Sequence, residues 1–322
     1  MATSVAIAGA ALAGLTVVTD RVAAAREARA EAAYPPEGEF VDVGGRRVHA
    51  VIAGEGPDLV LLHGANGTLR EFTFHLVERL AERYRVIALD RPGLGYTDRT
   101  DPSYRRAFAG DAESPAEQAA LLAAAAQKLG AERPIVLGHS FGGIVGFAWA
   151  LDQPLAALVS VAGVANPWPG DLGWIYTVNG TSLGGALVVP AITAYTPPAR
   201  LEAAVESVFA PQAPPEGYSE HIGPALAMRR EAFRANARQV NTLRPHVVEM
   251  VKRYGEIGVP VEIIHGSADT SVPLRVHSIT LPQQIPGAQL TVLDGVGHMP
   301  HHTHADEVIA AIDRAATRAG LR

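Results

Sequence analysis

The serine at position 140 lies in a sequence context that could make it a nucleophile. It is the centre of the pentapeptide GHSFG (residues 138–142), with an apolar run at 135–137 before it and another at 144–150 after it. This order predicts a short buried strand, a turn too tight for bulky neighbours, and a helix whose free N–H groups lie behind the serine hydroxyl. Because a chain with 32 glycines can produce the pattern by chance, its meaning depends on the elements and partners around it.

The segment Gly138–Gly143 and its flanking runs together resemble the nucleophile elbow of the α/β-hydrolase superfamily. Four further motifs of this superfamily occur in the expected order along the chain. They are a His-Gly loop at 63–64 and a D-R-P-G turn at 90–93 before the elbow, and a G-x-x-D loop at 266–273 and a histidine that follows the last predicted strand after it. The resemblance covers most of residues 40–317. It implies an α/β-hydrolase fold with a serine-centred active site.

The resemblance implies a catalytic triad of Ser140, Asp269 and His298, in the chain order of this superfamily. Each residue falls just past the C-terminal end of a predicted strand, and in a parallel sheet these ends form one edge. His298 would remove the proton from Ser140, and Asp269 would fix the imidazole tautomer and stabilise its cation. The alternative for Asp269 is a loop aspartate that caps Val272.

The same resemblance implies an oxyanion hole built from backbone N–H groups. One donor follows the nucleophile, at Phe141, and the other follows the His-Gly pair, at Ala65. Asn66 is the alternative to Ala65.

Other polar residues near these motifs have structural interpretations. We expect Asp90 to hold its turn through side-chain-to-backbone hydrogen bonds rather than to act in catalysis. His301, His302 and His304 cluster beside His298, but no cysteine accompanies them and their spacing matches no metal site. We therefore expect no metal and no cofactor.

The remaining periodicity predicts alternating strands and helices. Two strands flank Gly44-Gly45, a two-residue hairpin signal. Apolar runs then predict buried strands at 59–62, 85–89, 135–137, 155–161, 261–265 and 290–293, and helices are expected at 69–83, 116–129 and 305–317. A capping box with proline at the first helical position, Ser114-Pro115-Ala116-Glu117, marks the start of the second of these helices. This order predicts an α/β class with a mostly parallel, doubly wound sheet.

Residues 166–255 interrupt this rhythm with prolines and helical patterns, without a strong strand signal. An insertion after the sixth strand resembles the helical lid of hydrolases, so residues 39–165 and 256–322 would form the core. Aromatic residues of the insertion could line an acyl pocket, the candidates being Trp168, Trp174, Tyr176 and Tyr195. The alternative is a set of extra helices without a functional role.

The composition is that of an ordinary globular chain of 322 residues with a net charge of −6 and no cysteine. No basic run appears, which argues against a nucleic-acid partner. Without cysteines the chain has no disulfides and no thiolate metal site.

The first 19 residues carry no charged side chain. A helix over this alanine-rich segment barely reaches the ~30 Å of a bilayer's hydrocarbon layer. We expect residues 1–20 to be an N-terminal membrane anchor, with a cleaved signal segment or a helix packed on a partner as alternatives. As an anchor, with Arg21, Arg26 and Arg29 on its C-terminal side, it would leave the main domain in the cytoplasm; as a cleaved signal, it would mean export. Residues 21–38 would then be a linker that is helical or frayed until Pro35-Pro36 ends it.

The function expected from these features is hydrolysis of a carboxylic ester, or a related lactone or amide, of a small to medium apolar substrate. Serine at position 140 argues against the dehalogenase and epoxide-hydrolase branches, in which an aspartate attacks carbon. Cleavage of a C–C bond or a haloperoxidase-like perhydrolysis on the same triad are alternatives. A receptor-like member with little turnover is another, and a membrane-attached scaffold a fainter one.

Overall fold

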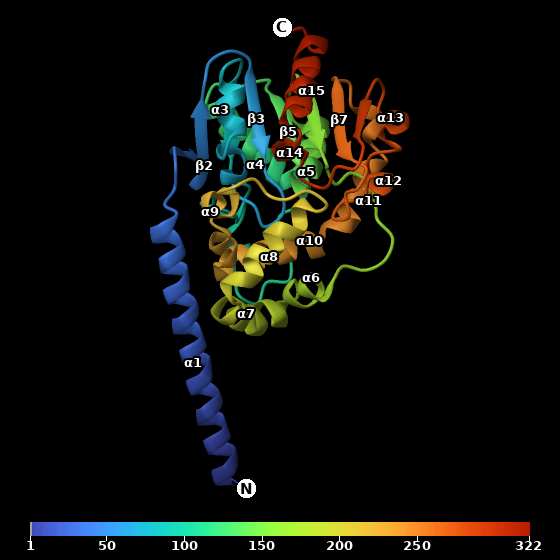
Figure 1. Cartoon of the computed structure of the whole chain (residues 1–322). Coiled ribbons are helices and arrows are strands. Elements are labelled where there is room, and N and C mark those ends of the chain that lie inside the picture. The colour runs from blue at the N-terminus through green and yellow to red at the C-terminus, as the bar shows by residue number, and fades with distance from the viewer. Residues whose placement is uncertain (1) are drawn as a thin grey trace.

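The computed structural model describes the backbone of residues 2–322 and the side chains of residues 14–322. Its centre is one eight-stranded sheet with the order β1-β2-β4-β3-β5-β6-β7-β8 (Figure 1). Strand β2 pairs antiparallel with both of its neighbours, β1 and β4, and every pairing among β3 to β8 is parallel. The strands are β1 (Glu39–Val43), β2 (Arg46–Ala53), β3 (Asp58–Leu62), β4 (Arg85–Leu89), β5 (Ile135–His139), β6 (Ala157–Val161), β7 (Val261–Gly266) and β8 (Gln289–Leu293).

The predicted hairpin is present between β1 and β2. Gly44 and Gly45 have φ angles of 60° and 79°, the left-handed conformations that a tight two-residue hairpin turn requires. The central strands β3, β4, β5 and β6 are apolar on both faces because helices cover both sides of the sheet.

Two buried clusters, one on each face of the sheet, form the core. Helices α4 and α5 pack on one face, and α3 and α15 on the other (Figure 1). The capping box at Ser114 is confirmed: its hydroxyl accepts from the Glu117 N–H, and the Glu117 carboxylate accepts from the Ser114 N–H. The core helices and turns are α2 (Arg70–Thr73), α3 (Leu76–Ala81), η1 (Pro102–Arg105), α4 (Pro115–Lys128), α5 (Phe141–Asp152), η4 (Tyr254–Glu256), α12 (Leu274–His277), α13 (Leu281–Gln284), α14 (Pro300–Thr303) and α15 (Ala305–Arg318).

The single helix expected over 69–83 is wrong. The segment forms two short helices, α2 and α3, because His75 leaves the helical region with φ −152°. The first of them starts where the Leu69 N–H donates to a carboxylate oxygen of Asp90 at 2.7 Å. The other Asp90 oxygen accepts from the Tyr96 N–H at 2.9 Å, so this aspartate holds its turn.

Residues 166–255, called the insertion below, connect β6 to β7 through helices that lie beyond the C-terminal ends of the strands (Figure 1). Helix α10 joins the insertion to the core: the Gln239 side chain donates to Pro92 O and accepts from Arg91. The elements are α6 (Trp174–Asn179), η2 (Gly184–Val188), α7 (Val189–Tyr195), α8 (Pro198–Phe209), α9 (Tyr218–Ile222), η3 (Pro224–Met228), α10 (Arg230–Asn241) and α11 (Leu243–Val251).

Residues 2–33 form one continuous helix, α1 (Ala2–Ala33). Its C-terminal half is not a free linker, because α1 packs along α7 and buries Ala23 and Ala30 against the insertion. Its N-terminal half extends past the body of the molecule (Figure 1). The segment expected to be an anchor or signal lies largely outside the described side chains. Within the described part of the chain, every helix falls short of the length and apolar character that crossing a bilayer requires.

Candidate active site

Ser140 lies on a strained turn between β5 and α5. Its backbone has φ 53° and ψ −118°, a conformation that costs a non-glycine residue on the order of 1–3 kcal/mol. The strain is held by two hydrogen bonds, from the Ser140 N–H to Val161 O at 3.1 Å and from the Val164 N–H to Ser140 O at 2.9 Å. The turn therefore presents Ser140 at the N-terminus of α5, as the Gly-x-Ser-x-Gly pattern predicts.

The glycines around Ser140 are required by close backbone approach. A Cβ at Gly142 would lie 2.1 Å from Leu62 O, and one at Gly138 would lie 2.2 Å from Gly142 O. Both neighbours are backbone atoms that no side-chain rotation can move away. The elbow thus packs directly onto the end of β3, which carries the His-Gly loop.

Asp269 and His298 form a close pair at the same edge of the sheet. His298 Nδ1 lies 2.7 Å from Asp269 Oδ2. The other carboxylate oxygen accepts from the N–H groups of Ser271 and Val272 at 2.8 and 2.9 Å. Asp269 therefore caps its loop and orients His298 at once. Burial disfavours the carboxylate, but the hydrogen bonds from His265 and His298 hold the pKa of Asp269 well below its usual range.

His265 is a neighbour of this pair that the sequence analysis missed. Its Nε2 lies 3.1 Å from Asp269 Oδ2 and 2.7 Å from Val272 O, and both of these atoms are acceptors. Nε2 must therefore carry the proton, and Nδ1, 2.7 Å from the Ser278 hydroxyl, accepts when the ring is neutral. The only sequence signal for this role is the position of His265 at the end of the strand that leads into the aspartate loop.

His139 connects the serine turn to His298. Its Nε2 donates to the backbone oxygen of His298 at 3.0 Å, and the two ring centroids lie 4.9 Å apart. Among the described residues no hydrogen bond joins Ser140 Oγ to the His298 ring. Catalytic hydrogen bonds of this kind are often long before substrate binds.

A buried carboxylate, Glu71, faces His139 from the other side. Glu71 Oε1 lies 2.6 Å from His139 Nδ1 and 3.2 Å from His301 Nε2. Burial disfavours the His139 cation, but Glu71 and the His298 carbonyl outweigh it, so the pKa of His139 is raised. Burial instead lowers the pKa of His301 to about 4. The arrangement is a buried ion pair between Glu71 and His139 with a neutral His301 beside it.

The loop after β3 that carries Ala65, called the oxyanion loop below after its expected role, is held by a fully buried arginine. Arg91 donates to His63 O at 2.9 Å and to Gly64 O at 3.1 Å, and its guanidinium lies 4.2 Å from the centre of the Phe141 ring. In a trans peptide the N–H points away from the carbonyl, so anchoring Gly64 O turns the Ala65 N–H to the opposite side. The Asn66 N–H donates to Asn236 Oδ1 at 2.8 Å and is occupied.

Comparison with known proteins identifies the family. The model of the alpha/beta hydrolase family matches residues 59–311, which is most of the chain. The chain belongs to the alpha/beta hydrolase family. As a member with esterase relatives, it is a hydrolase.

Several relatives match over nearly the whole hydrolase chain. An uncharacterized protein of Mycobacterium tuberculosis is 28% identical, covering 87% of this chain and 81% of the relative. A pimeloyl-[acyl-carrier protein] methyl ester esterase of Vibrio parahaemolyticus is 27% identical, covering 80% and 94%. A solved structure described as a membrane phospholipase A, 19% identical, shares the fold with a TM-score of 0.64 and covers 97% of each chain.

One group of side chains in this hydrolase could be considered for a metal. Among the described residues, Glu71, His139 and His301 bring three potential ligand atoms within 4.8 Å of one another. Two ligands on one tetrahedral Zn²⁺, each at about 2.0–2.1 Å, would be about 3.3 Å apart. The 2.6 Å between Glu71 and His139 is too short for that geometry, so the group fits an ion pair better than a metal site.

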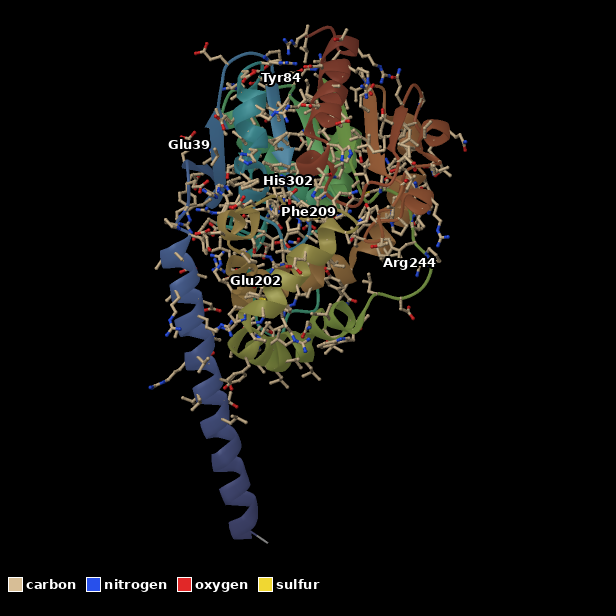
Figure 2. The ribbon with its side chains drawn as sticks, viewed as in Figure 1. Glu39, Tyr84, Glu202, Phe209, Arg244 and His302 are labelled. Atoms are coloured by element: carbon tan, nitrogen blue, oxygen red, sulfur yellow. The ribbon has the colours of Figure 1, made fainter. Side chains whose placement is uncertain are left out.

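Some aromatic residues of the insertion are exposed to solvent, and others contact residues near the candidate site. Trp174 and Tyr195 are 64% and 53% exposed, so neither belongs to the core, and their place beside an acyl pocket stays a prediction. The Tyr176 hydroxyl lies against Asn66 and Asn236, beside the oxyanion loop. Near His298, Phe209 of the insertion meets His302 of the core with ring centroids 5.8 Å apart (Figure 2).

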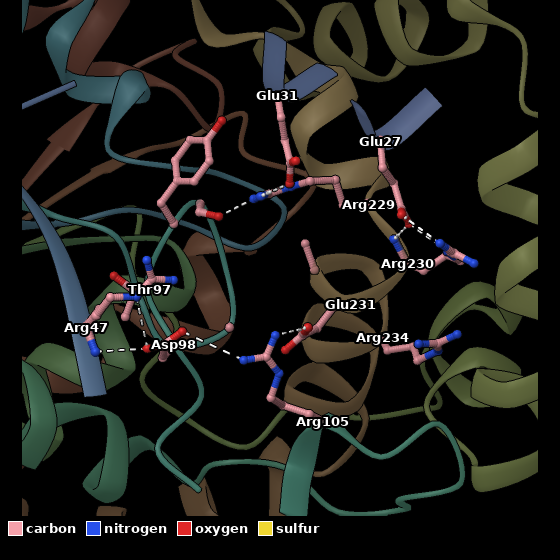
Figure 3. Close-up of a pocket in the computed structure, with 14 residues that line it drawn as sticks. Glu27, Glu31, Arg47, Thr97, Asp98, Arg105, Arg229, Arg230, Glu231 and Arg234 are labelled. Atoms are coloured by element: carbon pink, nitrogen blue, oxygen red, sulfur yellow. Dashed lines mark hydrogen bonds and ion pairs between the residues drawn. The ribbon is translucent and has the colours of Figure 1, made fainter. Parts of the chain in front are cut away.

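A cleft of about 440 Å³ is lined by none of Ser140, Asp269 and His298. It opens between α1, the loop at 93–98 and α10, and its walls are charged (Figure 3). These charges are largely paired: Arg230 contacts Glu27 at 2.7 Å, Arg229 contacts Glu31 at 3.1 Å, and Arg105 contacts Glu231 at 2.8 Å. The cleft therefore belongs to the contact surface between α1 and the rest of the molecule.

Proposed function

We propose that this hydrolase cleaves carboxylic esters through a Ser140–His298–Asp269 triad. The observation that carries the proposal is the Asp269–His298 pair, 2.7 Å apart, at the same sheet edge as the strained turn of Ser140. The Asp269 side chain is held in one orientation because its other oxygen accepts from two backbone N–H groups. A carboxylate fixed in this way keeps the proton of His298 on Nδ1 and leaves Nε2 free to act as a base.

The reaction would proceed in two halves. Ser140 Oγ attacks the ester carbonyl while its proton passes to His298 Nε2, and the carbonyl electron pair moves onto the oxygen. Collapse of this intermediate expels the alkoxide, which takes the proton from His298 and leaves an acyl-serine. Water then attacks the acyl-serine with the same histidine as base, which releases the acid and restores Ser140.

We propose the N–H groups of Phe141 and Ala65 as the donors that stabilise the oxyanion. Asn66 is a weaker candidate because its N–H already donates to Asn236. One such donor is typically worth ~3–4 kcal/mol in the transition state.

The proposed substrate is an ester, lactone or amide with a small to medium apolar acyl group. The Vibrio relative named above is a methyl ester esterase, which agrees with ester chemistry. We propose that the insertion acts as a lid over this substrate, because it lies beyond the strand ends and brings Tyr176 to the oxyanion loop. We also propose that the uncharged N-terminal segment attaches the protein to a membrane.

A chain-length panel of p-nitrophenyl esters tests the proposed chemistry. The full chain should hydrolyse at least one ester, and Ser140→Ala should lower kcat by at least about a thousandfold. Ser207→Ala, an exposed serine on α8, is the matched control and should retain full turnover. Activity that survives in Ser140→Ala would exclude Ser140 as the nucleophile. A folded wild-type protein without ester turnover would contradict the proposed ester chemistry and favour a C–C substrate or a receptor role.

A further inference from the structure

Two segments of the chain that lack charged side chains lie next to each other. The first is residues 1–19, and the second is residues 172–199 of the insertion, between Asp171 and Arg200. Helix α1 packs along α7, and Thr19 Oγ1 lies 3.1 Å from the Tyr195 hydroxyl. Arg26 donates to Ala194 O and Thr196 O at 2.9 and 2.7 Å. The described end of the first segment is thus fixed against the end of the second.

Large apolar side chains are exposed on both segments. On α6, η2 and the residue just before η2 these are Trp174 (64% exposed), Leu187 (66%) and Leu183 (66%), and on α1 they include Leu15 (60%) and Val18 (54%). Scattered exposed leucines are normal on a protein surface, but a concentration on adjoining uncharged segments marks an interaction surface. We call these five residues the apolar end.

On both segments the charged residues begin soon after the contact between Thr19 and Tyr195. Beyond Thr19, α1 carries Asp20 and Glu27, and both pair with Arg230 at the start of α10. Figure 3 shows the pair of Glu27 and Arg230. On the insertion, the first charge after the uncharged segment is Arg200. An uncharged apolar surface that is bordered by charged residues is typical of a protein face that contacts a lipid bilayer. Tyr195 is at that boundary and Trp174 lies within the apolar end, and such aromatic residues are favoured at membrane interfaces.

We propose that the apolar end rests on a lipid bilayer, so that the insertion faces the membrane. This inference rests on the proposed membrane attachment of the N-terminal segment. That segment alone is a weak attachment, since a helix over this alanine-rich stretch barely reaches the ~30 Å of a bilayer's hydrocarbon layer. Stable anchoring generally needs two signals, and the exposed side chains of α6 and η2 supply the second. Acyl substrates that partition into lipid would then reach the insertion directly.

Vesicle binding of the full chain tests this arrangement. Phosphatidylcholine vesicles with and without brominated acyl chains are mixed with the protein, and flotation and tryptophan fluorescence are measured. Bromine quenches only tryptophans in the bilayer, and of the three tryptophans Trp149 is buried in the core and Trp168 is partly buried. We expect brominated vesicles to quench the wild-type fluorescence and to leave Trp174→Phe nearly unquenched.

Surface variants give a second readout. Leu183→Ser/Leu187→Ser should weaken partitioning into vesicles roughly tenfold or more, with unchanged p-nitrophenyl ester turnover in buffer. The matched control is Ile279→Ser/Leu321→Ser, which removes exposed apolar side chains from the core domain and should bind vesicles as the wild type does. Both variants alter exposed side chains, so we expect both to fold as the wild type does.

The outcomes separate this inference from the attachment on which it rests. Flotation of the wild type without quenching of Trp174 would overturn the placement of the apolar end while leaving the N-terminal attachment intact. Absence of flotation would overturn both. Loss of self-association in Leu183→Ser/Leu187→Ser, with unchanged vesicle binding, would instead identify the apolar end as a contact between copies of this chain.

Discussion

His139 is a titratable neighbour of the proposed catalytic base. Its ring centroid lies 4.9 Å from that of His298, and Glu71 on the opposite side raises the pKa of His139 against the effect of burial. Three titratable groups therefore act on His298: Asp269 favours its cation, whereas His139 and His265 disfavour it. Burial and these two histidines together lower the pKa of His298, although Asp269 opposes them.

This electrostatic balance predicts the pH dependence of hydrolysis. The reaction needs unprotonated His298, so its lowered pKa should extend activity below the ordinary histidine value of about 6.5. His139→Gln keeps a donor toward His298 O but removes the imidazole that helps to lower the pKa of His298, which should move the acid limb of kcat/KM to higher pH. The control His246→Gln, in α11, should not move it. An unchanged acid limb in His139→Gln would show that His139 does not tune His298.

Residues differ in how far the sequence could predict them. Ser140, Asp269 and His298 were predicted because each stands in a local motif after a strand, and the structure brings Asp269 and His298 together. Glu71 and His265 were not predicted, because their roles depend on partners distant in the chain or on burial. No local pattern distinguishes Glu71 from an ordinary acidic residue in the first turn of a helix.

At the scale of elements, the active-site edge depends on backbone contact between the serine turn and β3. Gly142→Ala would place a Cβ 2.1 Å from Leu62 O and 2.8 Å from His63 O. We expect a loss of at least about 1–3 kcal/mol in unfolding free energy, together with loss of ester turnover, because the oxyanion loop must shift. Thermal and denaturant unfolding would measure the first effect. Gly258→Ala, where a Cβ meets nothing within 4 Å, is the control and should leave both stability and turnover unchanged.

Elements with strong local signals were predicted well, and those set by tertiary contacts were not. Helix α4 begins at its capping box, and the hairpin turns at Gly44-Gly45, as expected. The helix expected at 69–83 breaks at His75, where apolar periodicity gives no warning. Docking of α1 on the insertion was also not predicted for residues 21–33, because its ion pairs join Glu27 and Glu31 to arginines some 200 positions away.

At the scale of the whole molecule, buried neutral histidines should make stability depend on pH. Burial lowers the pKa of His63, His277 and His301 to about 4 each. The unfolded chain binds these protons near pH 6.5 and the folded chain only near pH 4, so stability falls as pH decreases through this window. The raised pKa values of His49 and His139 act in the opposite sense, but their contribution is complete once the pH is well below the unfolded value of about 6.5.

We therefore expect the unfolding free energy to decrease by a few kcal/mol between pH 7 and pH 5. Guanidinium chloride titrations at pH 7, 6 and 5 would measure the decrease as a falling midpoint with an unchanged slope. His301→Asn should reduce the difference in unfolding free energy between pH 7 and pH 5, because one titrating group is removed. A midpoint that stays constant or rises toward pH 5 would contradict the neutral state of these histidines.

The central claim, that Ser140 is a nucleophile activated by His298, is tested most directly by covalent labelling. A fluorophosphonate probe reacts with activated serines, and the mass of the labelled peptide identifies the residue. The account predicts a single adduct on the peptide that contains Ser140, lost in Ser140→Ala and strongly slowed in His298→Asn. Labelling that persists in Ser140→Ala, or that maps to another residue, would contradict it.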